Sequence, residues 1–193
     1  MKKVLAGLVA GLALAACSGE AEKETLETVN IPNEPLEATI FESEKQAENV
    51  DEEEVKVSIK TYLESSESLL NQRYPYEEVL DLGEPLTESE QATFTEINTL
   101  LKENDENFAL YIGSNTLPEN YQKETERISA YVTGFNSYLV ELDFLMDDEE
   151  ELALADLAVL GNMPEHVNGR EQAKIEEFLA EKGIETKLFA DMQ

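Results

Sequence analysis

The chain is poor in the residues that build most metal sites and nucleic-acid interfaces. Its 193 residues include one Cys, one His, no Trp, and only 14 Lys and Arg together. A single Cys excludes an internal disulfide framework, and a single His excludes a site with several histidine ligands. Because 43 Asp and Glu bring the formal net charge to -29, the clustered cations that bind phosphate are missing, and we expect no nucleic-acid partner.

The first twenty residues have the pattern of a secretory signal. Two lysines precede an apolar run from 4 to 16, which is too short to cross a bilayer with a hydrocarbon core of ~30 Å. The run ends at the only thiol, in the sequence Leu14-Ala15-Ala16-Cys17. This sequence resembles the bacterial lipobox. The resemblance implies that a diacylglyceryl group is attached to Cys17 and that cleavage makes Cys17 the new N-terminus.

Removal of a signal peptide at residues 1–16 would leave 12 basic against 43 acidic residues, a net charge of -31. Buried acyl chains hold a protein at a membrane by about 0.8 kcal/mol per CH₂ group. An acidic body is repelled by anionic lipid. We therefore expect the lipid on Cys17 to anchor the protein at the outer face of the cytoplasmic membrane, with the folded part held away from the bilayer.

The mature chain divides by composition into two parts. Residues 17–49 are polar and acidic, and we expect a lipidated Cys followed by a flexible tether, in which only residues 36–41 could dock on the domain. Residues 50–193 have the size of one domain and show helical periodicity nearly throughout. The expected fold class is all-α, an antiparallel helical bundle of four to five helices after a disordered acidic tether.

Apolar spacing and helix-end signals place the expected helices. Pro75 should lie in a connection, Thr87 should open a capping box, and Asn168 and Gly183 should begin and end the last helix. Between residues 118 and 160 the pattern allows either one long helix or two. The expected ranges are 51–72, 87–112, 116–145, 148–160 and 168–183.

A polar residue interrupts the apolar seam of the second expected helix. Asn104 takes a position between Leu101 and Phe108 where an apolar residue is expected, and residues 104–108 read N-D-x-x-F. Together with the lipobox, the acidic tether and a helical body of this size, the motif resembles the NDxxF-motif lipoproteins of Gram-positive bacilli. The resemblance covers the mature domain and implies a Gram-positive cell surface and a helical fold. It implies no activity.

The motif itself suggests where its partners lie. Asn104 and Phe108 are four residues apart and share a helix face, so a buried Asn104 needs hydrogen-bond partners. If the chain turns near residue 115, Asp105 should pair with Arg127, and Asn104 should bind the Tyr131 hydroxyl or a backbone group. Two structural interpretations are that Asn104 sets the register of the helices, or that it caps a broken helix. The functional interpretation is that Asn104 and Asp105 border a small polar pocket for a ligand or partner group.

Three further features have weaker signals. The acidic run 147–151 could attract Ca²⁺, but it lacks the spacing of an EF-hand loop and fits a solvated helix junction. His166 has no second His or Cys for a metal site and is expected in a surface loop. The stretch 152–160 is apolar almost all round and should be central to the bundle or a face for a partner.

The sequence therefore predicts a membrane-anchored extracytoplasmic lipoprotein with a non-catalytic role in binding or envelope organisation. We assign no catalytic residue, no metal ligand and no cofactor, and we expect a protein or cationic partner in the cell envelope. The alternatives are a carboxylate-dependent envelope enzyme and a cation-responsive surface protein. A buried carboxylate with a raised pKa in a cleft would favour the enzyme.

Overall fold

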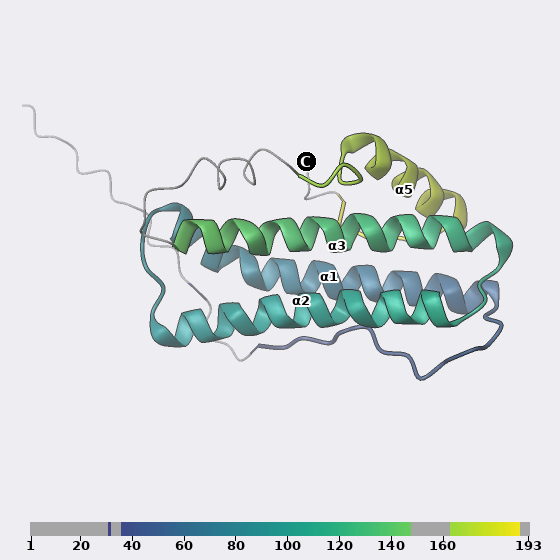
Figure 1. Ribbon diagram of the computed structural model, residues 1–193, viewed down its shortest axis with the longest axis horizontal. Coiled ribbons are helices and arrows are strands. Elements are labelled where there is room, and N and C mark those ends of the chain that lie inside the picture. Colours follow the sequence, from purple (N-terminus) through teal and green to yellow (C-terminus); the bar gives the residue numbers. More distant parts are fainter. Residues whose placement is uncertain (1–30, 32–35, 148–162, 190–193) are drawn as a thin grey trace, which may run out of the picture.

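The computed structural model describes residue 31, residues 36–147 and residues 163–189. Within these ranges it contains α1 (Glu52–Asp81), α2 (Glu88–Ser114), α3 (Glu119–Asp147) and α5 (Gly169–Lys182). The three long helices lie side by side in alternating directions, and α5 packs on α3 (Figure 1). The described residues form no strand beyond one isolated bridge. The all-α class is confirmed, and the expected helix at 148–160 falls outside the described residues.

Helix α1 continues to Asp81, beyond its expected end at residue 72, and Pro75 lies inside it. A proline in a helix interior removes one backbone hydrogen bond, which normally favours a break. Here the neighbouring side chains are held by other helices: Arg73 is fully buried, and the Tyr76 ring lies 5.7 Å from the ring of Phe94. The connection expected between residue 72 and Thr87 is therefore wrong as far as Asp81, since contacts with other helices keep this segment helical.

The predicted helix-end signals at two other places are confirmed. Thr87 and Glu90 form a complete capping box at the start of α2. The Asn168 side chain accepts hydrogen bonds from two backbone N–H groups at the start of α5, and Gly183 ends that helix in the left-handed conformation with φ of 67°. Because the N–H of Ile184 reaches the carbonyl of Leu179 at 2.9 Å, α5 has the C-terminal cap that the sequence predicts.

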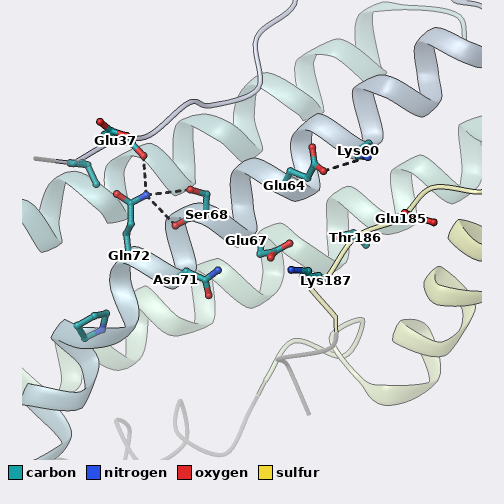
Figure 2. Close-up of a pocket in the computed structure, with 12 residues that line it drawn as sticks. Glu37, Lys60, Glu64, Glu67, Ser68, Asn71, Gln72, Glu185, Thr186 and Lys187 are labelled. Carbon is teal, nitrogen blue, oxygen red and sulfur yellow. Dashed lines mark hydrogen bonds and ion pairs between the residues drawn. The ribbon is translucent and has the colours of Figure 1, made fainter. Parts of the chain in front are cut away.

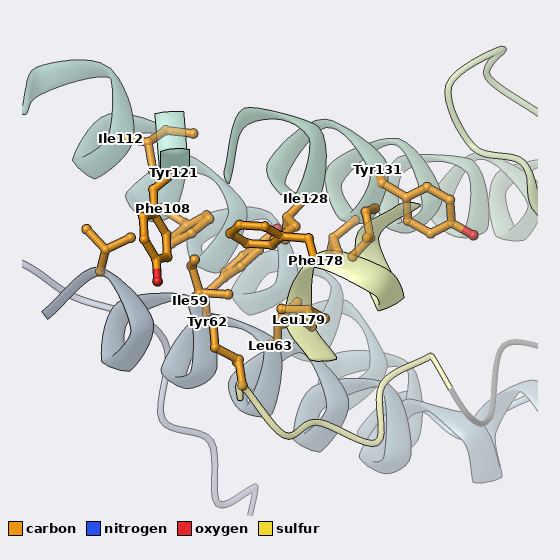
Figure 3. Close-up of a cluster of buried hydrophobic side chains, with 14 of the residues drawn as sticks. Ile59, Tyr62, Leu63, Phe108, Ile112, Tyr121, Ile128, Tyr131, Phe178 and Leu179 are labelled. Carbon is orange, nitrogen blue, oxygen red and sulfur yellow. The ribbon is translucent and has the colours of Figure 1, made fainter. Parts of the chain in front are cut away.

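Buried side chains form two clusters along the bundle. The larger cluster joins all four described helices, and Figure 3 shows its aromatic and aliphatic side chains converging from them. The smaller cluster lies between α1 and α2 and contains Leu69, Tyr76, Phe94, Ile97 and Leu101. Polar residues are also buried in the bundle, among them Arg73, Asn104, Asp105 and Asn136.

Residues 36–50 form an extended segment that we name the strap. It runs alongside α2 (Figure 1), and its side chains Phe41 and Val50 are 3% and 5% exposed. At its far end Asn115 accepts from the N–H of Glu48 and donates to the carbonyl of Lys45. The packed part of the chain therefore starts before the boundary expected at residue 50, and the suggested docking of residues 36–41 is present.

None of the described helices is both long enough and apolar enough to cross a membrane.

Candidate functional site

The three motif residues Asn104, Asp105 and Phe108 lie on the buried side of α2. Asn104 and Phe108 are 0% exposed and Asp105 is 4% exposed. One turn of helix separates Asn104 from Phe108, so both face α1 and the strap, while Asp105 lies further round and faces α1 and α3. The motif thus contacts every element that surrounds α2.

Asn104 joins the strap to α1. Its Oδ1 accepts from the backbone N–H of Phe41 at 2.7 Å, and its Nδ2 donates to Ser66 Oγ at 2.9 Å and to the Tyr62 carbonyl at 3.4 Å. Asn107 adds a second tie, because its Nδ2 donates to the carbonyl of Phe41 at 3.0 Å. Both backbone groups of Phe41 are therefore bound by amide side chains of α2.

Aromatic rings reinforce this connection. The ring of Phe108 is stacked on that of Tyr62 at 4.0 Å, and the ring of Phe41 meets Phe108 edge-on at 5.2 Å. Edge-on and offset pairs of this kind contribute about 0.5–1.5 kcal/mol beyond the area that they bury. We call the set Phe41, Tyr62, Asn104, Asn107 and Phe108 the clasp, since it fixes the strap to α1 and α2.

Asp105 is the centre of a separate polar group. It accepts from the Tyr62 hydroxyl at 2.6 Å and from Asn136 Nδ2 of α3 at 3.0 Å. Burial raises the pKa of Asp105 to about 6, and the two hydrogen bonds only partly oppose this effect. Burial and the negative charge of Asp105 also raise the pKa of Tyr62 well above its usual value. The phenol therefore remains the donor and Asp105 the acceptor.

The expected partners of the motif are partly wrong. Arg127 forms ion pairs with Glu124 and, at 3.0 Å, with Glu171 of α5, so it belongs to the α3–α5 contact rather than to Asp105. The Tyr131 hydroxyl donates to Gln172. The backbone alternative for Asn104 is confirmed. Asp105 meets α3 at Asn136, nine residues or about two and a half turns beyond the predicted partner Arg127.

A groove between α2 and α3 lies over Asp105. It has a volume of about 470 Å³, within the range typical of small-molecule sites. Polar residues Asp105, Thr133 and Asn136 line it together with apolar Leu101 and Val140. A buried carboxylate with a raised pKa therefore lines a cleft, and this arrangement favours a carboxylate-dependent enzyme.

A larger and more open hollow lies on the outer face of α1. It has a volume of about 940 Å³, and its walls come from the start of the strap and from residues 185–187 (Figure 2). Its side chains are mixed in charge; Lys60 pairs with Glu64 at 3.6 Å, and Gln72 donates to the carbonyl of Glu37. The polar groups that Figure 2 joins by dashed lines are already paired within the chain, so this hollow is a weaker candidate.

A buried arginine lies near the other end of the bundle. The guanidinium of Arg73 is 0% exposed; it pairs with Asp143 at 2.5 Å, with Glu77, and with the Oδ1 of Asn98 at 2.9 Å. Its cationic carbon also lies 5.0 Å from the centre of the Phe94 ring. Burial raises the pKa of Asp143 despite this arginine. We interpret the group as a structural connection between α1, α2 and α3.

Sequence reasoning did not single out Arg73 or Asn136, although a signal exists for both. Arg73 follows Leu69 by four residues, and Asn136 follows Val132 by four, so both are polar residues on apolar helix faces. Phe41 lies in the patch 36–41 that was expected to dock, but its bonds to Asn104 and Asn107 were not predicted, because it lies outside any periodic pattern.

The remaining expected sites divide between described and undescribed residues. No group of three or more His, Cys, Asp or Glu side chains in the described ranges could hold a metal ion. His166 is exposed in the connection to α5, as expected for a loop residue, although its ring lies close to Gly134 of α3. Cys17 and the apolar stretch 152–160 fall outside the described residues, as do residues 148–151 of the acidic run.

Comparison with known proteins returned no matching family model, no matching curated protein and no matching solved structure.

Proposed function

We propose that the chain is a membrane-anchored extracytoplasmic lipoprotein whose helical domain has a non-catalytic role in binding or envelope organisation. The observation that carries the anchoring is the sequence Leu14-Ala15-Ala16-Cys17 after an apolar run that is too short to span a bilayer. The resemblance to NDxxF-motif lipoproteins would place the protein at a Gram-positive cell surface.

The clasp supports the anchoring part of this proposal, because it attaches the N-terminal segment to the helices. If Cys17 carries lipid, the chain between Cys17 and the strap is the connection between membrane and bundle. Nineteen steps along the chain separate Cys17 from Leu36, which allows a reach of at most about 65 Å at ~3.3–3.6 Å per residue. The clasp would then be the place where an N-terminal anchor is fixed to the helices.

Fatty-acid labelling of cells tests the anchoring. We expect the full chain to incorporate an alkyne-tagged fatty acid and to sediment with membranes. Cys17→Ser should lose the label and retain residues 1–16, which a mass measurement of the intact protein would show. Ser18→Ala is the matched control and should behave as the parent chain. Equal labelling of the parent chain and of Cys17→Ser would remove the proposal.

One observation favours a second candidate, a carboxylate-dependent envelope enzyme. Asp105 lies in a groove, its pKa is raised to about 6, and the hydrogen bonds from Tyr62 and Asn136 hold it in one orientation. A group with these properties could exchange a proton with a bound substrate near neutral pH. Hydrolysis of a cell-wall polymer by the parent chain, and its loss in Asp105→Asn but not in Glu96→Gln, would establish this alternative.

A cation-responsive protein remains the third candidate, and it has the least support. The described residues offer no metal-binding cluster. Titration with Ca²⁺ during thermal unfolding tests it directly, because a ligand that binds only the folded state raises the melting temperature. A melting temperature that matches ionic-strength controls would remove this candidate.

A further inference from the structure

Asn136, which lines the groove between α2 and α3, has a side-chain acceptor without a donor. Asn136 is 3% exposed, and its buried Oδ1 has no hydrogen-bond partner among the described residues. Its amide orientation is fixed, because Nδ2 donates to Asp105 Oδ2 and the ionised carboxylate can only accept. An unpaired buried acceptor costs about 1–3 kcal/mol. A donor that enters the groove would satisfy it.

The neighbouring Asp105 has acceptor capacity left. Two ionised carboxylate oxygens offer about four lone-pair sites, and the Tyr62 hydroxyl and the Asn136 amide take two of them. At the rim, the groove is lined by Glu106 and Glu141. One lysine also lines it, Lys102, and that ammonium already pairs with Glu106 at 3.6 Å. The groove therefore offers acceptors and negative charge in excess.

The walls of the groove have a different character. Leu101, Ala109 and Val140 line it with apolar surface. A volume of about 470 Å³ admits a molecule with an apolar body as well as a polar head. Because the described residues hold no cluster of three metal-ligating side chains, an organic cation fits this combination better than a metal ion does.

We propose that the groove between α2 and α3 binds a small primary amine with an apolar body, whose ammonium donates to the carboxylate of Asp105 and to Asn136 Oδ1. The three N–H donors of an ammonium suit a site with free acceptors on two residues, and the apolar body covers Leu101 and Val140. This inference rests on the binding role proposed above and names its ligand class. It does not depend on the lipid at Cys17.

Calorimetric titration of the full chain with 2-phenylethylamine tests the proposal. The neutral analogue 2-phenylethanol has the same ring and chain but no charge. At physiological ionic strength, where the Debye length is about 8 Å, we expect saturable binding of the amine and at least tenfold weaker binding of the alcohol. Equal affinity for the two probes, or no binding of the amine, would overturn the proposal and would leave the anchoring untouched.

Two variants locate the site. Asp105→Asn removes the charge that holds the ammonium, and Ala109→Leu fills the groove from an exposed position of α2 without touching the polar group. Each should weaken amine binding at least tenfold. Glu96→Gln changes the charge equally at an exposed position that does not line the groove, and it should bind as the parent chain does. Loss of binding in Glu96→Gln, or its retention in Ala109→Leu, would refute the location.

The pH dependence of binding gives an independent readout. Asp105 accepts from Tyr62 of α1 and Asn136 of α3 and lies near the charge of Glu106 on its own helix. The other charged groups that line the groove are Lys102 of α2 and Glu141 of α3. Since the pKa of Asp105 is about 6, its ionised fraction falls about tenfold between pH 7 and pH 5. Amine affinity should fall by about the same factor, and an affinity that is constant over this range would contradict the contact.

Discussion

Replacement of Asp105 by Asn should make the protein more stable at neutral pH than the parent chain. Burial raises the pKa of Asp105 in the folded state from 3.8 to about 6. Folding therefore favours the protonated form, and the contribution of this carboxyl to stability falls as the pH rises from about 3.8 through about 6. The substituted Asn side chain carries no charge and has an N–H group that can donate a hydrogen bond. If the Asn136 amide flips, its Oδ1, which is unpaired in the parent chain, accepts that bond.

The sign and size follow from linkage. Between pH 3.8 and 6 the folded state binds more protons at Asp105 than the unfolded state does, so the contribution of this group to stability falls as the pH rises. With these two pKa values the loss is about 3 kcal/mol at pH 7, and about 1.3 kcal/mol of it develops between pH 5 and pH 7. Above pH 7 the loss is constant.

Urea unfolding of both proteins at several pH values measures this effect. The pKa values of other carboxyl groups shift in the opposite direction; those of Glu52 and Glu171 are lowered by hydrogen bonds. Their contributions cancel in the difference between variant and parent. We therefore expect the stability of Asp105→Asn minus that of the parent chain to increase by about 1.3 kcal/mol from pH 5 to pH 7 and then to level off.

Glu96→Gln is the control for this measurement, because Glu96 is exposed on the same helix. Its difference from the parent chain should not vary over the same pH range. A difference for Asp105→Asn that is equally flat would refute the reasoning, since it would mean that Asp105 has nearly the same pKa in the folded and unfolded states.

Three further substitutions test other parts of the structure. Asn104→Ala leaves the buried N–H of Phe41 without an acceptor and should lower the free energy of urea unfolding by about 1–3 kcal/mol, with faster hydrogen exchange at that amide; unchanged exchange would contradict the clasp. Gly134→Ala should lower stability by about 1–3 kcal/mol, because its Cβ would lie 2.8 Å from Cγ2 of the buried Val167, whereas Gly113→Ala, with nothing within 4 Å, should raise it by about 0.5–1 kcal/mol; similar thermal shifts for the two would refute this contrast. Arg73→Met should lower the free energy of urea unfolding by about 3 kcal/mol, because it leaves a partly buried carboxylate unpaired, and a loss below 1 kcal/mol would count against the importance of that pair.

Helix ends were the most predictable part of this fold. Thr87 and Glu90 cap the start of α2, Asn168 caps the start of α5, and Gly183 caps its end. Each of these caps is formed within one turn, so the residues that carry the signal are also the residues that make the contact. Pro75 shows the limit of such local rules. Its helix continues because Arg73, two residues before Pro75 in α1, is held by partners on α2 and α3.

The site was predictable only in part, for the same reason. The position of Asn104 on an apolar seam correctly indicated a buried polar group that needs partners. Asp105 could not be paired correctly from sequence, because its partner on α3 depends on the register of two long helices, and a shift of about two and a half turns replaces Arg127 by Asn136. The strap was least predictable, since it follows no period and its contacts come from side chains that are distant in sequence, such as Asn104, Asn107 and Asn115.

The course of the strap has a mechanical consequence. A pull on the N-terminal end of the strap would reach the contacts near Leu36 first, then those of Phe41, and only then the backbone bonds at Ala47 and Val50. The strap would thus separate from α1 and α2 one contact at a time, before the pull reaches the start of α1 along the chain. In this geometry the contacts of the strap break before α1 is pulled from its end, and those of Phe41 are the first fully buried ones in that order.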